Sequence, residues 1–315
     1  MLVLSRDARG LAAVTLATCW QAGGAVFLAR SSGPQSALRI ALLAFTIAGL
    51  LSWLPVVCSQ AGRGRRKDPA LKGRLVARGV LVVVTTVAFL AFYAALARIP
   101  VEAASAAEVA AGVVVVLAFT RPGRSRAREA RGQRIVALST VLVCAIAVGV
   151  ALRGLPPGEG DPGAIGFGLA LALIAGACGG AIVLLSAASG SDGVPASQLA
   201  RERFTGAALV AGFVVLVTGS AAGVSATTWR GEAIVGALTI ALPILLLQWG
   251  LVRAEPVRSE LVLATLPALV HLGDAVWQRR WDPLLGGTMG LLVVTVAVSQ
   301  FVPACRTGRR GGATA

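Results

Sequence analysis

The segment RIPVEAASAAEVAAGVVVV, residues Arg98 to Val116, decides the fold. It is almost entirely small and apolar, yet it holds two glutamates, Glu102 and Glu108. A run this apolar is typical of a helix in a bilayer, where a charge at the centre costs at least about 2.5–3.5 kcal/mol. We therefore expect an acid in this segment to face protein or water, and not lipid.

The composition of the whole chain also favours a lipid bilayer as its surroundings. The 315 residues are 56% hydrophobic and 14% charged, with a mean hydropathy of +0.80. A soluble domain carries about 25% charged residues. The formal net charge is +15, and the basic residues lie in short runs between apolar segments, as in membrane proteins. This distribution indicates a membrane protein and argues against nucleic acid as a partner.

Membrane helices need about 20 mostly apolar residues, and ten segments meet this condition. The first begins near the N-terminus and continues through residues 21–29 without a convincing small-residue cleavage site, so we interpret it as an uncleaved helix and not a signal peptide. The predicted helices are 10–29, 38–60, 76–97, 101–120, 133–152, 164–187, 205–227, 232–252, 259–277 and 284–303.

The five cysteines do not predict a disulfide or a zinc site. Their number is odd, and their spacing matches no known framework. Four of them lie inside apolar runs, where a cysteine behaves as a small hydrophobic residue. The five are Cys19, Cys58, Cys144, Cys178 and Cys305.

Basic residues between the helices predict the orientation. With the N-terminus in the cytoplasm, 21 Lys and Arg residues fall on the inner side, Arg201 and Arg203 among them, and 7 on the outer side, Arg30 and Arg39 among them. This is the bias of the positive-inside rule. We expect a multi-pass protein of the cell (inner or plasma) membrane, with both termini cytoplasmic and basic loops beside an anionic inner leaflet.

The chain divides into related halves. The Pro- and Gly-rich connection 153–163 separates residues 1–152 from residues 164–315. ALARIPVEAASAAEVAAGVVVV, from Ala95, and GLVRAEPVRSELVLATLPALVH, from Gly250, share a helix end, an Arg, a Pro-containing turn and a following apolar helix. Five helices per half place the copies in opposite orientations, as in secondary transporters with a midplane binding site. The predicted fold is an all-α membrane protein of two inverted five-helix repeats.

With these features the chain resembles the drug/metabolite transporter superfamily, in particular its EamA-like ten-helix members. The resemblance covers almost the whole chain. It implies transport, often export, of amino acids, metabolites or drugs, commonly driven by a proton or substrate gradient. The segments that carry it are CWQAGGAVFLAR, FYAALARIPVEAASAAEVAAGVVVVLAF, LLLQWGLVRAEPVRSELVLATLPALV and LLGGTMGLLVVTVAVSQF.

The chain departs from this family at two places. Small proton-coupled relatives have an essential Glu in the first helix, where this chain has only Gln21. The first helix of the second half, LALALIAGACGGAIVLL, lacks a Trp equivalent to Trp20. The resemblance therefore leaves proton coupling open.

Glu108 is the first candidate functional residue. It lies six residues, or about 9 Å, deeper than Glu102, which we expect to be a solvated interfacial acid beside Pro100. The residues one turn from Glu108 are small or slightly polar, which allows a cavity or a close helix contact. Glu108 could bind a cationic group or carry a proton; the alternative is a protonated Glu hydrogen-bonded to a neighbouring helix. These neighbours are Ala104, Ser105, Ala111 and Gly112.

The predicted ninth helix carries three further titratable residues. At 100° per residue, Glu260, His271 and Asp274 lie near one face. His271 and Asp274 are one turn apart, and such a pair can relay protons, although two ligands do not make a metal site. The alternative is a solvated pair at the outer end. Pro267, and Pro243 in the preceding helix, could kink these helices or be tolerated in packing.

Other polar or aromatic side chains in the spans complete the candidate binding site, with Ser105 beside Glu108: Trp20, Gln21, Tyr93, Gln248 and Trp249. Each has the alternative of an interfacial anchor or a structural hydrogen bond. The match of residues 158–163 to G-x-G-x-x-G follows no strand, and the sequence contains no ATP-binding loop. We predict no cofactor and no metal.

The sequence thus predicts a secondary transporter, and by resemblance an exporter, of a small organic solute. The alternative is a membrane scaffold or regulatory subunit with a transporter-like fold. An enzyme is not expected, because no catalytic constellation is clustered. A homodimer is left open.

Overall fold

A computed structural model describes residues 5–31, 33–59, 71–120, 127–154 and 161–301. These residues form helices and turns, without a strand. The helices are α1 (Arg6–Ser31), α2 (Pro34–Ser59), α3 (Leu71–Leu96), α4 (Val101–Phe119), α5 (Ala127–Arg153), α6 (Pro162–Ser191), α7 (Ala196–Val217), α8 (Ala226–Gly236), the π-helical η2 (Ala237–Ala241), α9 (Leu242–Leu251), α10 (Pro256–Leu263), α11 (Leu266–Gln278) and α12 (Pro283–Phe301).

Eight helical segments in this part of the chain are long and apolar enough to cross a membrane. They include Ala226–Leu251, which runs through α8, η2 and α9, and Pro256–Gln278, which comprises α10 and α11. The outer faces are apolar too: on α7, Leu209, Phe213 and Leu216 are each at least 66% exposed. The chain therefore has the build of a multi-pass α-helical membrane protein.

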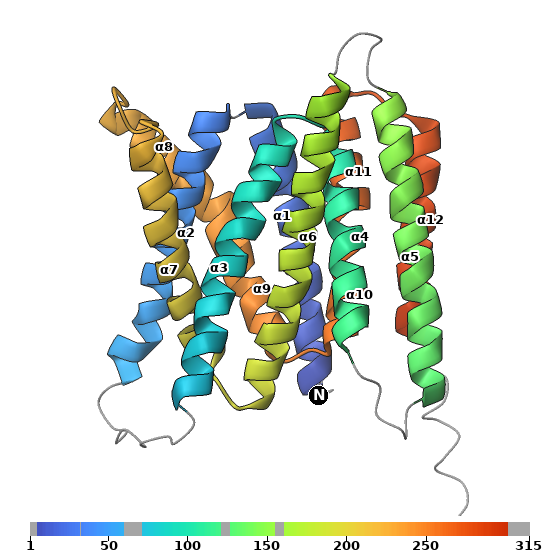
Figure 1. The fold of residues 1–315 in the computed structure, drawn as a ribbon, viewed down its shortest axis with the longest axis horizontal. Coiled ribbons are helices and arrows are strands. Elements are labelled where there is room, and N and C mark those ends of the chain that lie inside the picture. The colour runs from blue at the N-terminus through green and yellow to red at the C-terminus, as the bar shows by residue number, and fades with distance from the viewer. Residues whose placement is uncertain (1–4, 32, 60–70, 121–126, 155–160, 302–315) are drawn as a thin grey trace, which may run out of the picture.

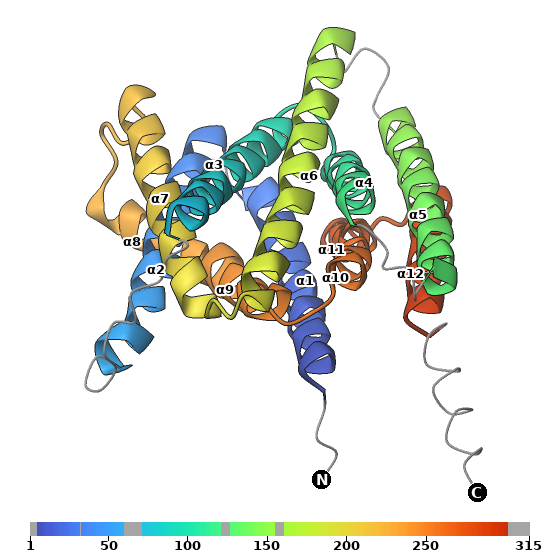
Figure 2. The same cartoon turned by 60° about the horizontal axis from the view of Figure 1, so that its bottom comes forward.

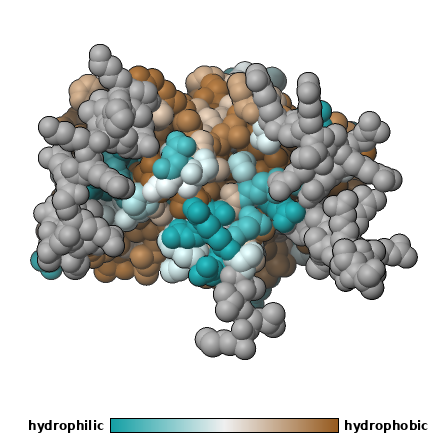
Figure 3. Space-filling view, turned by 90° about the horizontal axis from the view of Figure 1, so that it is seen from below, coloured by the Kyte–Doolittle hydropathy of each residue, from teal (hydrophilic) through white to brown (hydrophobic). Residues whose placement is uncertain are grey.

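The helices run side by side between two ends of the molecule (Figure 1). We call the end where α4 begins and α11 stops the upper end, and the end where α1 and α10 begin the lower end. The last turn of α12 also lies at the lower end, so both described ends of the chain share one face (Figures 1 and 2). Seen from below, apolar flanks surround a hydrophilic central patch (Figure 3).

The predicted helix at 205–227 is misplaced, since α7 spans Ala196–Val217. Three consecutive charged residues, Arg201 to Arg203, lower the hydropathy of its first turns and shifted the prediction downstream. The helix accommodates them: Arg201 stacks on the Trp53 ring, Glu202 pairs with Arg78 at 2.9 Å, and Arg203 is buried. The prediction that Arg201 and Arg203 lie in an inner loop is wrong, because both belong to α7.

Glycines allow the central helices to approach closely. A Cβ atom on Gly176 or Gly180 of α6 would overlap the α4 backbone at Glu108 or Gly112. A Cβ atom on Gly250 of α9 would likewise overlap the carbonyl of Gly10 on α1. Backbone contact of this kind requires a missing side chain, so these glycines fix the spacing between α4 and α6 and between α1 and α9.

Two helices of the second half are irregular near prolines. The π-helical turn η2 lies just before Pro243, and α10 and α11 are separated at Ala264 and Thr265, just before Pro267. Proline lacks the N–H group that would continue the helix ladder, and π-turns and prolines both bend helices. The interruption places Glu260 and His271 on different helices.

Arg39 lies inside α2 and not in the predicted outer loop. It is 8% exposed and donates to the Glu232 carboxylate at 2.8 Å and to the Ser220 carbonyl at 2.7 Å. Burial of either charge alone would be unfavourable, and the pair fastens α2 to α8 near the upper end.

Candidate functional site

A cavity of about 170 Å³ lies among α1, α3, α4, α6, α7 and the helices from η2 to α11. Most of its lining is apolar, with Phe89, Phe92 and Tyr93 of α3 on one side. Six polar side chains also line it: Gln21, Tyr93, Glu108, Arg203, Thr239 and Glu260. A largely apolar pocket with a few polar groups is the usual form of a small-molecule site.

Glu108 reaches this cavity from the middle of α4. Gly176 packs on the backbone at Glu108, so α4 and α6 touch there. The Glu108 side chain is partly buried, and no hydrogen bond or ion pair joins it to another described residue. A carboxyl group without a protein partner is available to a proton or to a cationic ligand.

Glu260 reaches the same cavity from α10. It is 5% exposed, and its Oε2 atom has no hydrogen-bond partner among the described residues. Its carboxyl lies against Gly112, one turn below Glu108 on α4, at a point where a Cβ atom would overlap it. The sequence grouped Glu260 with His271 and Asp274, whereas the structure brings it beside Glu108.

Arg203 of α7 supplies the positive charge of the cavity lining. It is 3% exposed; Nε donates to Thr85 Oγ1 and Nη1 to Gln248 Oε1, both at 2.6 Å. Gln248 in turn donates to Ser186 Oγ at 3.2 Å. No ion pair within 4.0 Å joins Arg203 to Glu108 or Glu260, so the two carboxyl groups and the guanidinium line the cavity separately.

The predicted site residues divide into four groups. Gln21, Tyr93 and Glu108 line the cavity. Gln248 is fully buried behind it and holds Arg203, whereas His271 and Asp274 lie at the upper end. The three outside both places are Trp20, which is 40% exposed; Trp249, which is 38% exposed and stacks with Arg253; and Ser105, which donates to the Glu102 carbonyl.

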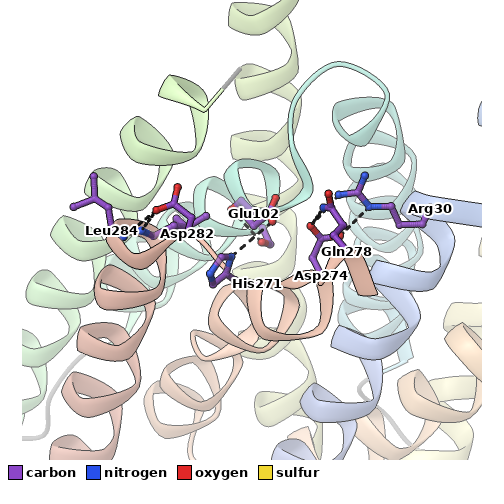
Figure 4. Close-up of polar contacts among 9 residues, drawn as sticks. Arg30, Glu102, His271, Asp274, Gln278, Asp282 and Leu284 are labelled. Carbon is purple, nitrogen blue, oxygen red and sulfur yellow. Dashed lines mark hydrogen bonds and ion pairs between the residues drawn. The ribbon is translucent and has the colours of Figure 1, made fainter. Parts of the chain in front are cut away.

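Above the cavity, four residues from three helices form what we call the upper tie: Arg30 of α1, Glu102 of α4, and His271 and Asp274 of α11 (Figure 4). Two parallel hydrogen bonds of 2.8 Å join Arg30 to Asp274, and Gln278 also donates to Asp274. Glu102 Oε1 lies 3.8 Å from His271 Nδ1.

The expectation that Glu102 is a solvated interfacial acid is wrong, and so is the alternative of a solvated pair for His271 and Asp274. Glu102 and His271 are 9% and 5% exposed, and Asp274 is 4% exposed. Pro100 ends the α3–α4 turn and starts α4 with Glu102 in its first turn, directed toward α11. Arg30, assigned to an outer loop, ends α1 and covers Asp274.

A second group, the lower tie, joins the start of α1 to the start of α10: Arg6, Asp7, Glu255 and Arg258. Arg6 donates to the carbonyls of Gly190 and Val252 at 3.3 Å. Asp7 accepts from the Glu255 backbone N–H at 2.9 Å and pairs with Arg258 at 3.5 Å. Polar contacts therefore link the helices around the cavity at both ends.

Within the described residues, no three His, Cys, Asp or Glu side chains come together as metal ligands do. The cavity could bind a small molecule against its apolar walls. Charged parts of that molecule would then lie near Glu108, Glu260 or Arg203.

No family model and no curated protein matches this chain. A solved structure described only as "Crystal structure of protein" has the same fold, with a TM-score of 0.64 over 94% of this chain and 99% of its own. At 18% sequence identity, the likeness concerns the fold alone.

Proposed function

We propose that the chain is a secondary transporter, and an exporter, of a small organic solute, similar to ten-helix drug/metabolite transporters. It crosses the membrane ten times as two inverted repeats, residues 1–152 and 164–315, joined by the outer linker 153–163. The solute binds in the Glu108 cavity, which opens alternately to each side. One observation carries the proposal: a cavity with unpartnered acids lies between the halves and is bounded by polar ties at both ends.

Ten crossings require α7 and α12 in addition to the eight long apolar segments. The charged residues of α7 have partners inside the molecule, and its outer face is apolar. The apolar part of α12 extends over Pro283–Val298. Both helices run between the same two ends as their neighbours (Figures 1 and 2).

Packing supports the inverted repeat. α3 and α4 pack against α6, the first helix of the second half, while α9, α10 and α11 pack against α1, the first helix of the first half. The turns before α4 and α10 also match. Arg98 and Arg253 each donate to the carbonyl four residues earlier, one at the upper and one at the lower end.

The basic residues support a cytoplasmic lower end. Without Arg201 and Arg203 on one side and Arg30 and Arg39 on the other, all four of which lie inside helices, the ten-crossing topology keeps 19 Lys and Arg residues on the lower side and 5 on the upper side. Both termini are then cytoplasmic, and the upper tie faces the outside. Alternating access requires the two ties to break in turn, since each joins helices of opposite halves.

The proposal is tested by uptake into proteoliposomes. A panel of labelled small solutes, including amino acids and organic amines, is measured with and without a pH gradient. We expect saturable flux of at least one solute class above that of protein-free vesicles, and exchange of that solute across the membrane. A protein that carries none of the panel but retains its fold would instead support the scaffold or regulatory-subunit alternative.

A further inference from the structure

The upper tie contains more negative than positive charge. Glu102 and Asp274 contribute two carboxylates, and Arg30 contributes one guanidinium. Both hydrogen bonds of this guanidinium go to Asp274 and none goes to Glu102. With a neutral His271, the buried group carries one uncompensated negative charge. Uncompensated charge in a buried site is strongly unfavourable, so this group is one proton short of balance.

Neighbouring charged residues do not supply the missing positive charge. Arg98, between α3 and α4, donates to the Ala94 carbonyl and stacks on the Phe167 ring of α6. The remaining charged residues on the packed elements at this end are exposed: Arg153 ends α5, Asp161 caps α6, Arg279 and Arg280 follow α11, and Asp282 caps α12.

His271 is placed to hold the proton. Neither of its ring nitrogens has a hydrogen-bond partner among the described residues, and both are buried. The ring lies against Trp281, with 5.3 Å between centroids. The 3.8 Å from Nδ1 to Glu102 is within ion-pair range but too long for a hydrogen bond. A shared proton would turn this contact into a charge-assisted hydrogen bond.

We propose that Glu102 and His271 form a proton-binding site separate from the solute cavity, and that the bound proton holds the upper end closed. The proton ties α4 to α11, while Arg30 and Asp274 tie α1 to α11. Loss of the proton leaves two carboxylates facing each other across α4 and α11, and these helices separate. The gating role of the Glu102–His271 site rests on the proposed transport function. The binding of a proton at this site does not depend on that function.

The chain has a single histidine, so its imidazole can be followed directly. Full-length protein labelled with ¹⁵N-histidine is placed in lipid nanodiscs and studied by NMR from about pH 4 to about pH 9, the range in which histidines titrate. We expect the ring to change from protonated to neutral in this range. In Glu102→Gln the pH of this change should differ from that of the wild-type protein, because the carboxylate that faces the ring is lost.

Asp282→Asn is the matched control, since Asp282 is an exposed acid at the same end, and it should leave the titration unchanged. A ring that stays neutral throughout in the wild-type protein overturns the proposal without any variant. So does a titration that is the same in Glu102→Gln as in wild type.

Gating is measured by spin labels on cysteines introduced at Arg98 and Arg280, both exposed at the upper end, in a background without native cysteines. We expect a longer distance to gain population as the pH rises, and to be present at every pH in His271→Gln. A distance distribution independent of pH overturns the gate. Solute flux decides the proposed function separately, because titration and gating without flux would remove transport but keep the proton site.

Discussion

Glu108→Gln is expected to lower solute flux by about ten- to a hundredfold, because it removes the charge of an unpartnered carboxyl in the cavity. The amide keeps the size of the side chain, so the change tests charge and not volume. A hydrogen bond to a charged group contributes about 1.5–3 kcal/mol, and every 1.4 kcal/mol is about a tenfold change in affinity. Flux is measured in proteoliposomes both as gradient-driven uptake and as exchange.

Both modes should fall, because Glu108 acts in binding the solute. Glu260→Gln should have an effect of the same kind, since its carboxyl lines the same cavity. Asp192→Asn is the matched control: this acid is exposed after α6, and its loss should leave flux unchanged. Wild-type flux in Glu108→Gln would remove that residue from the mechanism.

Gly176→Ala is expected to destabilise the protein strongly for a change that adds a single methyl group. The added Cβ would overlap the backbone carbonyl of Glu108, and backbone cannot move aside as the end of a side chain can. Overpacking typically costs about 1–3 kcal/mol and occasionally more. Thermal unfolding of purified protein should therefore begin at a clearly lower temperature, and flux should fall as α4 moves away from α6.

Gly179→Ala provides the comparison within the same helix. A Cβ atom at Gly179 meets nothing within 4 Å, so this variant should unfold at or slightly above the wild-type temperature. Equal unfolding temperatures for the two variants would mean that α4 and α6 do not touch at Glu108 and Gly176.

The helical, membrane-spanning character of the chain could be predicted from the sequence, because long apolar runs separated by basic loops depend only on local composition. The ends of α7 could not. Arg201, Glu202 and Arg203 resemble a loop in a hydropathy profile, and only the fold shows that Arg78, Thr85 and Gln248 are near enough to pair with them.

The candidate site was predicted in part. Glu108 stood out as an acid among small residues, and Gln21 and Tyr93 as polar groups in apolar spans; all three line the cavity. Arg203 was missed, although a basic residue at the edge of an apolar run was a signal for it. Arg30 and Asp274 are in contact although they are 244 residues apart in the sequence. Such contacts depend on how the helices pack, and the periodicity of apolar residues along the sequence does not reveal this packing.

The most direct test of the account is the accessibility of a cysteine at Gly179, a cavity-lining position with room for a side chain. The native cysteines are replaced, and a membrane-impermeant thiol reagent is added to the cytoplasmic or the outer side of oriented vesicles. Alternating access predicts labelling from each side in turn, while a cysteine at Gly23, exposed on the outer face of α1, stays unlabelled from both. A Gly179 cysteine in folded protein that reacts from neither side, or from one side alone under all conditions, would contradict the transporter account.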